Sequence, residues 1–166
     1  MHLAGRGRSK RFLLLRYAFE RAEIITDLRA VADGEEAMDY LSGVDRFRDR
    51  KLYPLPFLVL VDFEMPKVNG LELLQWIRSQ PGLRRLAVIL FTTSRARHHV
   101  DLAYDLGVNS FVVKPRDVKG RIDFALALKA WWLTVNEFAS IKDTHAALGQ
   151  SSDEDLRAGG RSKARS

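Results

Sequence analysis

Cysteine is absent from this 166-residue chain. The absence excludes disulfides, thiolate metal sites and cysteine nucleophiles, and it fits a reducing cytosol. Long apolar runs are absent too: the stretch from Leu86 to Phe91 is far shorter than the roughly 20 residues that a membrane-spanning helix needs. Residues 1–10 lack a signal-peptide pattern, because only a short apolar run follows their basic residues. The sequence therefore predicts a cytoplasmic protein without a membrane partner.

Acidic residues are absent from the first part of the chain, where Glu20 is the first carboxylate. The positive charge, +6 in total with a pI near 9.8, is concentrated at the two ends. Its basic residues there are Arg6, Arg8, Lys10 and Arg11, and Arg157, Arg161, Lys163 and Arg165. Basic tails attract phosphates weakly. We interpret these ends as solvated segments rather than a nucleic-acid-binding surface.

The middle of the chain alternates strand and helix patterns, and its length and hydrophobic content suit one domain. The expected strands are residues 28–32, 57–61, 87–91 and 110–113. Asp33, Asn69 and Asp117 each precede a helical pattern, so we expect them to cap helices. This alternation predicts an α/β fold with a doubly wound parallel sheet.

The last helical pattern runs from Asp117 to Phe138. Its core-facing stripe is predicted to be Phe124, Leu128, Trp131, Val135 and Phe138. Trp132 falls beside this stripe, where an exposed indole would suit a partner interface, although burial is the commoner outcome. Residues 139–166 are polar and rich in small residues, so we expect a flexible tail that is too short and polar for a second core.

Polar side chains end three of the expected strands, with Asp62, Thr92 and Lys114 following or closing the apolar runs. The carboxyl ends of parallel strands lie along one edge of a sheet, where open α/β folds bind ligands. A carboxylate can be phosphorylated, a hydroxyl can donate to a phosphoryl oxygen, and an ammonium can offset the developing charge. The pattern therefore indicates phosphate chemistry, whereas the adjacent His98 and His99 are assigned no site.

Several segments together resemble the receiver domain of two-component response regulators. They are DGEEA (33–37), VDFEMP (61–66), NGLELL (69–74), FTTS (91–94) and NSFVVKP (109–115). The chain is most similar to the stand-alone receivers associated with phytochrome-type kinases. The resemblance implies a flavodoxin-like fold with the strand order 2-1-3-4-5 known from chemotaxis receivers. It implies a basic segment at residues 1–11, a receiver domain at 12–138 and a tail at 139–166.

The resemblance also implies a role for individual residues. Asp62 would be the phosphoacceptor, Thr92 would hydrogen-bond the phosphoryl group and move toward it, and Lys114 would pair with one of its oxygens. Phe111 would be the aromatic switch that turns inward when the threonine moves. The peptide between Lys114 and Pro115 would be cis, as is usual in the family.

The start of the chain departs from the family pattern. Receivers normally open with a buried strand that ends in an acidic pair holding Mg²⁺, but here those positions fall near Arg6 and Gly7. The metal would be left with Asp62 and the backbone carbonyl of Glu64, so we expect Mg²⁺ to bind weakly or not at all. The first strand is expected to be truncated or rudimentary.

Three explanations of this departure stay open. The start of the sequence is misassigned or truncated, or His2-Leu3-Ala4 forms a short strand in a divergent domain, or a basic side chain replaces the charge of the metal. The basic candidates are Arg6, Arg8 and Lys10.

The leading interpretation is a single-domain response regulator, not an enzyme, that signals by protein–protein interaction. Its expected partners are a sensor histidine kinase or phosphotransfer protein, with a homodimer as a further candidate. The alternative is a degenerate pseudo-receiver that binds partners without phosphorylation. A phosphate-ester hydrolase is disfavoured, because Phe63-Glu64 lacks the second aspartate of the common aspartate-nucleophile phosphatases.

Overall fold

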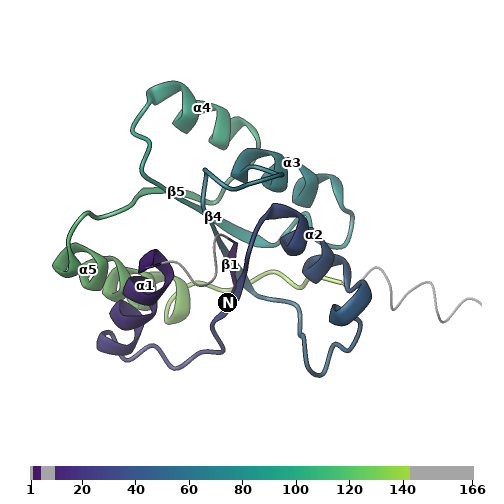
Figure 1. Cartoon of the computed structure of the whole chain (residues 1–166), viewed down its shortest axis with the longest axis horizontal. Coiled ribbons are helices and arrows are strands. Elements are labelled where there is room, and N and C mark those ends of the chain that lie inside the picture. Colours follow the sequence, from purple (N-terminus) through teal and green to yellow (C-terminus); the bar gives the residue numbers. More distant parts are fainter. Residues whose placement is uncertain (1, 5–9, 143–166) are drawn as a thin grey trace, which may run out of the picture.

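The computed structural model describes residues 2–4 and 10–142, which contain a parallel five-stranded sheet (Figure 1). Its strands are β1 (His2–Ala4), β2 (Arg29–Val31), β3 (Leu58–Val61), β4 (Ala87–Thr92) and β5 (Ser110–Val113). The spatial order is β2-β1-β3-β4-β5 and every neighbouring pair is parallel. The predicted α/β fold and strand order are confirmed.

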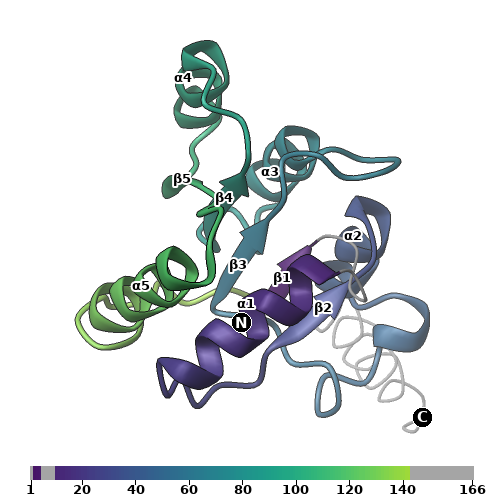
Figure 2. The ribbon, with the colours of Figure 1, turned by 60° about the vertical axis from the view of Figure 1, so that its left-hand side comes forward.

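Helices cover both faces of the sheet. One face carries α1 (Lys10–Arg21) and α5 (Val118–Leu128), which lie side by side in both ribbon views (Figures 1 and 2). The helices α2 (Gly34–Ser42), α3 (Gly70–Ser79) and α4 (Arg97–Asp105) follow β2, β3 and β4 on the other. A 3-10 turn, η1 (Asp45–Phe47), interrupts the long connection to β3, and a π-helical turn, η2 (Lys129–Leu133), continues α5.

The first strand is short but fully integrated. His2 to Ala4 pair with Arg29–Val31 on one side and with Val59–Val61 on the other. A rudimentary first strand was predicted and is confirmed, and it supplies hydrogen bonds to both neighbours. Ala4 is in register with Val61, so β1 ends level with the residue before Asp62.

Successive side chains of a strand point to opposite faces of the sheet, so the strands contribute to two cores, one on each face. Val59 and Val61 face α2, α3 and α4, whereas Leu58 and Leu60 face α1 and α5. All four side chains are at most 2% exposed, because β3 is central and covered on both faces. The continuous apolar run of this strand is therefore explained by burial on both sides.

The predicted N-caps are all present. The Asp33 carboxylate accepts from the Glu36 N–H (2.9 Å), and the Asp117 carboxylate accepts from the Gly120 N–H (2.7 Å). Asn69 forms a complete capping box, accepting from the Glu72 N–H (3.0 Å) while its own N–H donates to the Glu72 carboxylate (2.8 Å). Each cap satisfies backbone donors that a helix start leaves unpaired.

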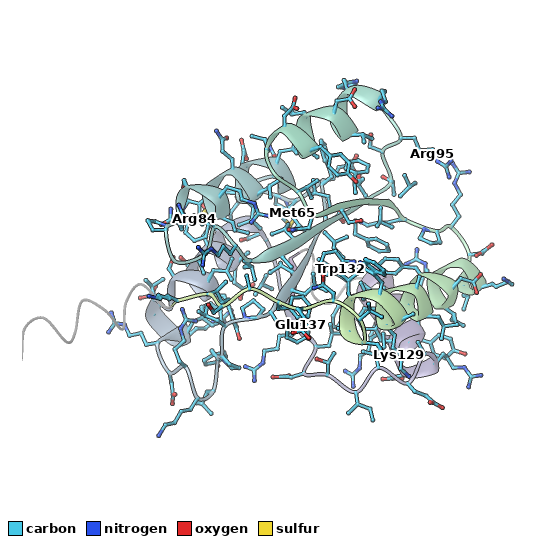
Figure 3. All side chains as sticks on the ribbon, turned by 180° about the vertical axis from the view of Figure 1, so that it is seen from behind. Met65, Arg84, Arg95, Lys129, Trp132 and Glu137 are labelled. Carbon is cyan, nitrogen blue, oxygen red and sulfur yellow. The ribbon has the colours of Figure 1, made fainter. Side chains whose placement is uncertain are left out.

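The final helix is shorter than predicted, and part of its core stripe was wrong. Trp131 and Val135 are 61% and 62% exposed, whereas Trp132 packs into the core with Phe124 and Leu128 (Figure 3). The cause is η2, because a π-helical turn holds more residues than an α-helical one and so rotates the following side chains.

The chain continues past η2 along the sheet. The Phe138 ring packs against Phe57 (4.9 Å between centroids) and lies near Trp132 (6.3 Å). The Lys142 N–H donates to the Gly82 carbonyl (3.1 Å), and Ile141 packs against the α2–α4 core. Residues 143–166, most of the predicted tail, lie outside the described residues. None of the helices in the described ranges has the length and apolar character to cross a membrane.

Candidate phosphoacceptor site

The carboxyl ends of β3, β4 and β5 bring Asp62 and Lys114 into contact. Asp62 directly follows β3 and Lys114 directly follows β5, and the Lys114 ammonium forms an ion pair with Asp62 Oδ2. Thr92 ends β4, the strand between them, and its carbonyl accepts from the Lys114 N–H (2.7 Å). The sequence prediction that these strand ends share one edge of the sheet agrees with this placement.

The ion pair is largely removed from water. The side chain of Lys114 is 8% exposed and that of Asp62 is 19% exposed. Asp62 Oδ1 also accepts from the Glu64 N–H at 3.3 Å. The Lys114 ammonium lies 5.7 Å from the centre of the Phe91 ring, within range of a cation–π attraction. A charge this buried requires a partner, and each of these two charges satisfies the other.

Thr92 is completely buried. Its hydroxyl oxygen accepts from the Ser94 N–H at 3.1 Å, which ties the end of β4 to the loop that leads into α4. Phe111 is half-buried in β5, in register with Leu90, and packs against the α2–α4 core. The roles of Thr92 and Phe111 as switch residues stay predictions. The predicted cis peptide before Pro115 is wrong: the described residues contain none, and the bond has the trans form that X–Pro peptides favour by about 0.5–1 kcal/mol.

The loop from Asp62 to α3 is held from two sides. A Cβ at Gly70 would lie 2.6 Å from the Asp62 carbonyl oxygen, so only glycine allows α3 to start this close to the loop. The Lys67 ammonium pairs with Glu35 (2.8 Å) and Asp33 (2.9 Å) at the start of α2. Hydrogen bonds to Glu35 and Asp33 raise the pKa of Lys67 above its ordinary value. The backbone around Asp62 is therefore anchored to both α2 and α3.

The comparisons with known proteins agree with this geometry. The family model for the response regulator receiver domain matches residues 11–123, which is more than half of the chain. The chain belongs to the response regulator receiver domain family.

Its similar proteins include phytochrome response regulators. The response regulator Rcp1 of Synechocystis is 30% identical over 120 residues, covering 72% of this chain and 80% of Rcp1. The response regulator RPA3017 in red light signalling of R. palustris superposes with a TM-score of 0.79 at 33% identity, covering 84% of this receiver and 97% of that chain. The phosphorylated cyanobacterial phytochrome response regulator RcpA superposes with a TM-score of 0.76 at 27% identity, covering 84% of this chain and 96% of RcpA. The predicted resemblance to phytochrome-associated receivers is confirmed.

The described residues offer Mg²⁺ few ligands at the acceptor edge. Rcp1 has a solved Mn²⁺-bound form (TM-score 0.69, 25% identity, 84% of this chain and 97% of that one), so receivers of this kind bind divalent cations. Here, residues 2–4 and 10–142 contain no group of three or more His, Cys, Asp or Glu placed to hold a metal. Mg²⁺ prefers several hard oxygen ligands. Asp62 already holds Lys114, and the chain has no carboxylate before Glu20.

Asp62 and the Glu64 carbonyl therefore stay the predicted metal ligands, and the Mg²⁺ binding that we predict for them is weak at best. Arg6 and Arg8 lie outside the described residues, as does the side chain of Lys10. Among the described side chains, Lys114 is the cation seen on Asp62.

His99 is a neighbour of the site that was not predicted from the sequence. Its ring lies 4.5 Å from the Phe63 ring, and its Nδ1 lies 2.8 Å from the Ser94 hydroxyl. Phe63 follows Asp62, and Ser94 bonds Thr92, so His99 contacts both loops beside the acceptor site. The spacing along α4 carries no signal for these contacts, because both partners lie outside that helix.

Proposed function

We propose that this receiver accepts a phosphoryl group on Asp62 from a sensor histidine kinase or phosphotransfer protein and signals through protein contacts. The observation that carries the proposal is the Asp62–Lys114 ion pair at the carboxyl ends of β3 and β5. A carboxylate oxygen of Asp62 attacks phosphorus, the phosphorus–nitrogen bond of the donor phosphohistidine breaks, and the leaving imidazole takes up a proton. The product is an acyl phosphate.

The neighbouring residues have distinct roles in this proposal. Lys114 exchanges its contact with the carboxylate for one with a phosphoryl oxygen, which limits the accumulation of negative charge. Thr92 donates its hydroxyl proton to another phosphoryl oxygen and moves toward it. Phe111, packed in the core beside β4, turns into the space that Thr92 leaves. The similar receiver RcpA has a phosphorylated form, and this supports the proposed sequence of events.

The wider setting follows from the same proposal. The domain at residues 12–138 acts in the cytoplasm as a switch rather than as an enzyme, and its output is a change in partner binding, including a second copy of the chain as a candidate partner. Beyond residues 12–138, His2–Ala4 also pair in the sheet and Ile141 packs against the α2–α4 core, and residues 5–9 and 143–166 lie outside the described residues.

One observation favours a second function, that of a pseudo-receiver. The lack of acids before Glu20 removes the usual metal ligands. A receiver of this kind would bind its partners constitutively through the same fold.

A small phosphodonor separates the two functions. Wild type and Asp62→Asn are incubated with acetyl phosphate over a series of Mg²⁺ concentrations, including EDTA alone, and intact mass spectrometry counts the phosphoryl groups. The proposal predicts one group on wild type and none on Asp62→Asn. No modification of wild type at any Mg²⁺ concentration would favour the pseudo-receiver.

A further inference from the structure

The two loops beside Asp62 meet on one side chain of α4. Phe63, the residue after Asp62, lies with its ring 4.5 Å from the His99 ring at an interplanar angle of 37°. The second loop is the one after β4, where Ser94 lies between Thr92 and α4. His99 is half-buried, which fits a side chain enclosed between two segments.

A continuous set of hydrogen bonds joins the buried Thr92 to His99. The Ser94 N–H donates to Thr92 Oγ1 (3.1 Å), and the Ser94 hydroxyl is hydrogen-bonded to His99 Nδ1 (2.8 Å). The same hydroxyl accepts from the Ala96 N–H (3.3 Å), the residue that precedes α4. Ser94 is therefore fixed by the residue that ends β4 and by the first turn of α4.

An imidazole suits this position because it offers both an aromatic face and a hydrogen-bonding nitrogen. The face packs on Phe63 and Nδ1 holds Ser94, so one residue contacts both loops. The ring of the neighbouring His98 also lies 4.2 Å from that of His99. Contiguous contacts of this kind between packed elements can carry energetic coupling between two sites.

We propose that His99 is a positioning residue that couples the acceptor loop and Thr92 to α4. The link exists in the unmodified protein. Its use in signalling rests on the proposed function: when Thr92 moves toward a phosphoryl group, the Ser94 N–H loses its acceptor, and Ser94 passes the displacement to α4 through His99.

Two substitutions of His99 separate its two contacts. His99→Asn keeps a hydrogen-bonding atom close to the position of Nδ1 but removes the ring. His99→Phe keeps the ring and removes the bond to Ser94. Ser94→Ala breaks the same bond from the other side, so it replaces His99→Phe if that variant does not fold. Tyr104→Ala, at an exposed position of α4, is the control.

The coupling is measured without phosphorylation by recording backbone amide chemical shifts of α4 in two perturbed proteins. Thr92→Val removes the hydroxyl that holds Ser94, and Phe63→Leu removes the ring that packs on His99. We expect the Thr92→Val response of α4 to persist with His99→Asn and to be lost with His99→Phe. The Phe63→Leu response is expected to show the reverse pattern. Tyr104→Ala should leave both responses in place.

The result that overturns the proposal is a Thr92→Val response of α4 that is as large in both His99→Phe and Ser94→Ala as in wild type. Loss of the response in Tyr104→Ala would also overturn it, because the coupling would then belong to the surface of α4 in general. In a separate arm with acetyl phosphate, His99→Phe should be modified at Asp62 like wild type but without the response of α4. Failure of wild type to be modified refutes the proposed function, while the two perturbations still decide the role of His99.

Discussion

The two sides of the acceptor edge differ in how much of the receiver site they hold. On the side of β3, β4 and β5, Asp62, Thr92 and Lys114 end adjacent strands, and two of them form an ion pair. On the side of β1, a three-residue strand completes the sheet, but the sequence that follows it supplies no carboxylate before Glu20. Three residues of β1 are therefore enough to pair with both neighbouring strands, whereas the sequence after them has no acidic pair of the kind that receivers normally carry.

The largest effect is expected from a substitution in β3, the strand next to β1 on one side and β4 on the other. Leu60 is 1% exposed and faces α1 and α5, so Leu60→Ala should lower the free energy of unfolding by about 2–5 kcal/mol. Urea denaturation measures the change. Leu126→Ala is the control, because Leu126 of α5 is 48% exposed, and its free energy of unfolding should stay within about 0.5 kcal/mol of wild type. Equal losses in the two variants would show that the central strand does not hold the sheet together.

A smaller effect is expected from breaking the Asp62–Lys114 ion pair at the ends of β3 and β5. Lys114→Gln leaves the Asp62 carboxylate without its partner, and the expected loss is about 1–3 kcal/mol, the usual cost of an unpaired buried polar group. Because Asp62 keeps some contact with water, the loss should not reach that of a fully buried pair. The double variant Asp62→Asn/Lys114→Gln should recover part of the stability, since neither residue is then charged. Additive losses would argue that the two side chains do not interact.

The smallest effect concerns the loop that carries Asp62. Asn69→Ala removes the capping box at the start of α3 and should cost about 1 kcal/mol. Gln75→Ala, exposed in the middle of the same helix, should leave stability nearly unchanged. Thermal unfolding of both variants measures the difference. A cap that contributes no more than Gln75 would mean that packing alone fixes the start of α3.

Local chemistry in the sequence predicted much of this architecture. The apolar run that ends at Asp62, the caps Asp33 and Asn69, and the order of strands and helices were all predicted, because each depends on nearby residues or on simple periodicity. The shared position of Asp62 and Lys114 followed from the geometry of parallel strands.

Features that depend on distant packing were not predicted. The π-helical turn at Lys129–Leu133 exchanges the environments of Trp131 and Trp132, and the sequence pattern of the helix continues unchanged through it. The Lys129 ammonium donates to the Ala22 carbonyl just after α1 (2.9 Å), a contact between segments far apart in the chain. The position of His99 between two loops is of the same kind.

The central claim is that the β3–β5 side can hold a phosphoryl group on Asp62. Its most direct test is a titration with beryllofluoride, a stable phosphoryl mimic, followed through the backbone amides of Thr92, Phe111 and Lys114 at several Mg²⁺ concentrations. Saturable shifts of these amides in wild type, absent in Asp62→Asn, are the predicted result. Spectra of wild type that stay unchanged at every concentration would contradict the claim.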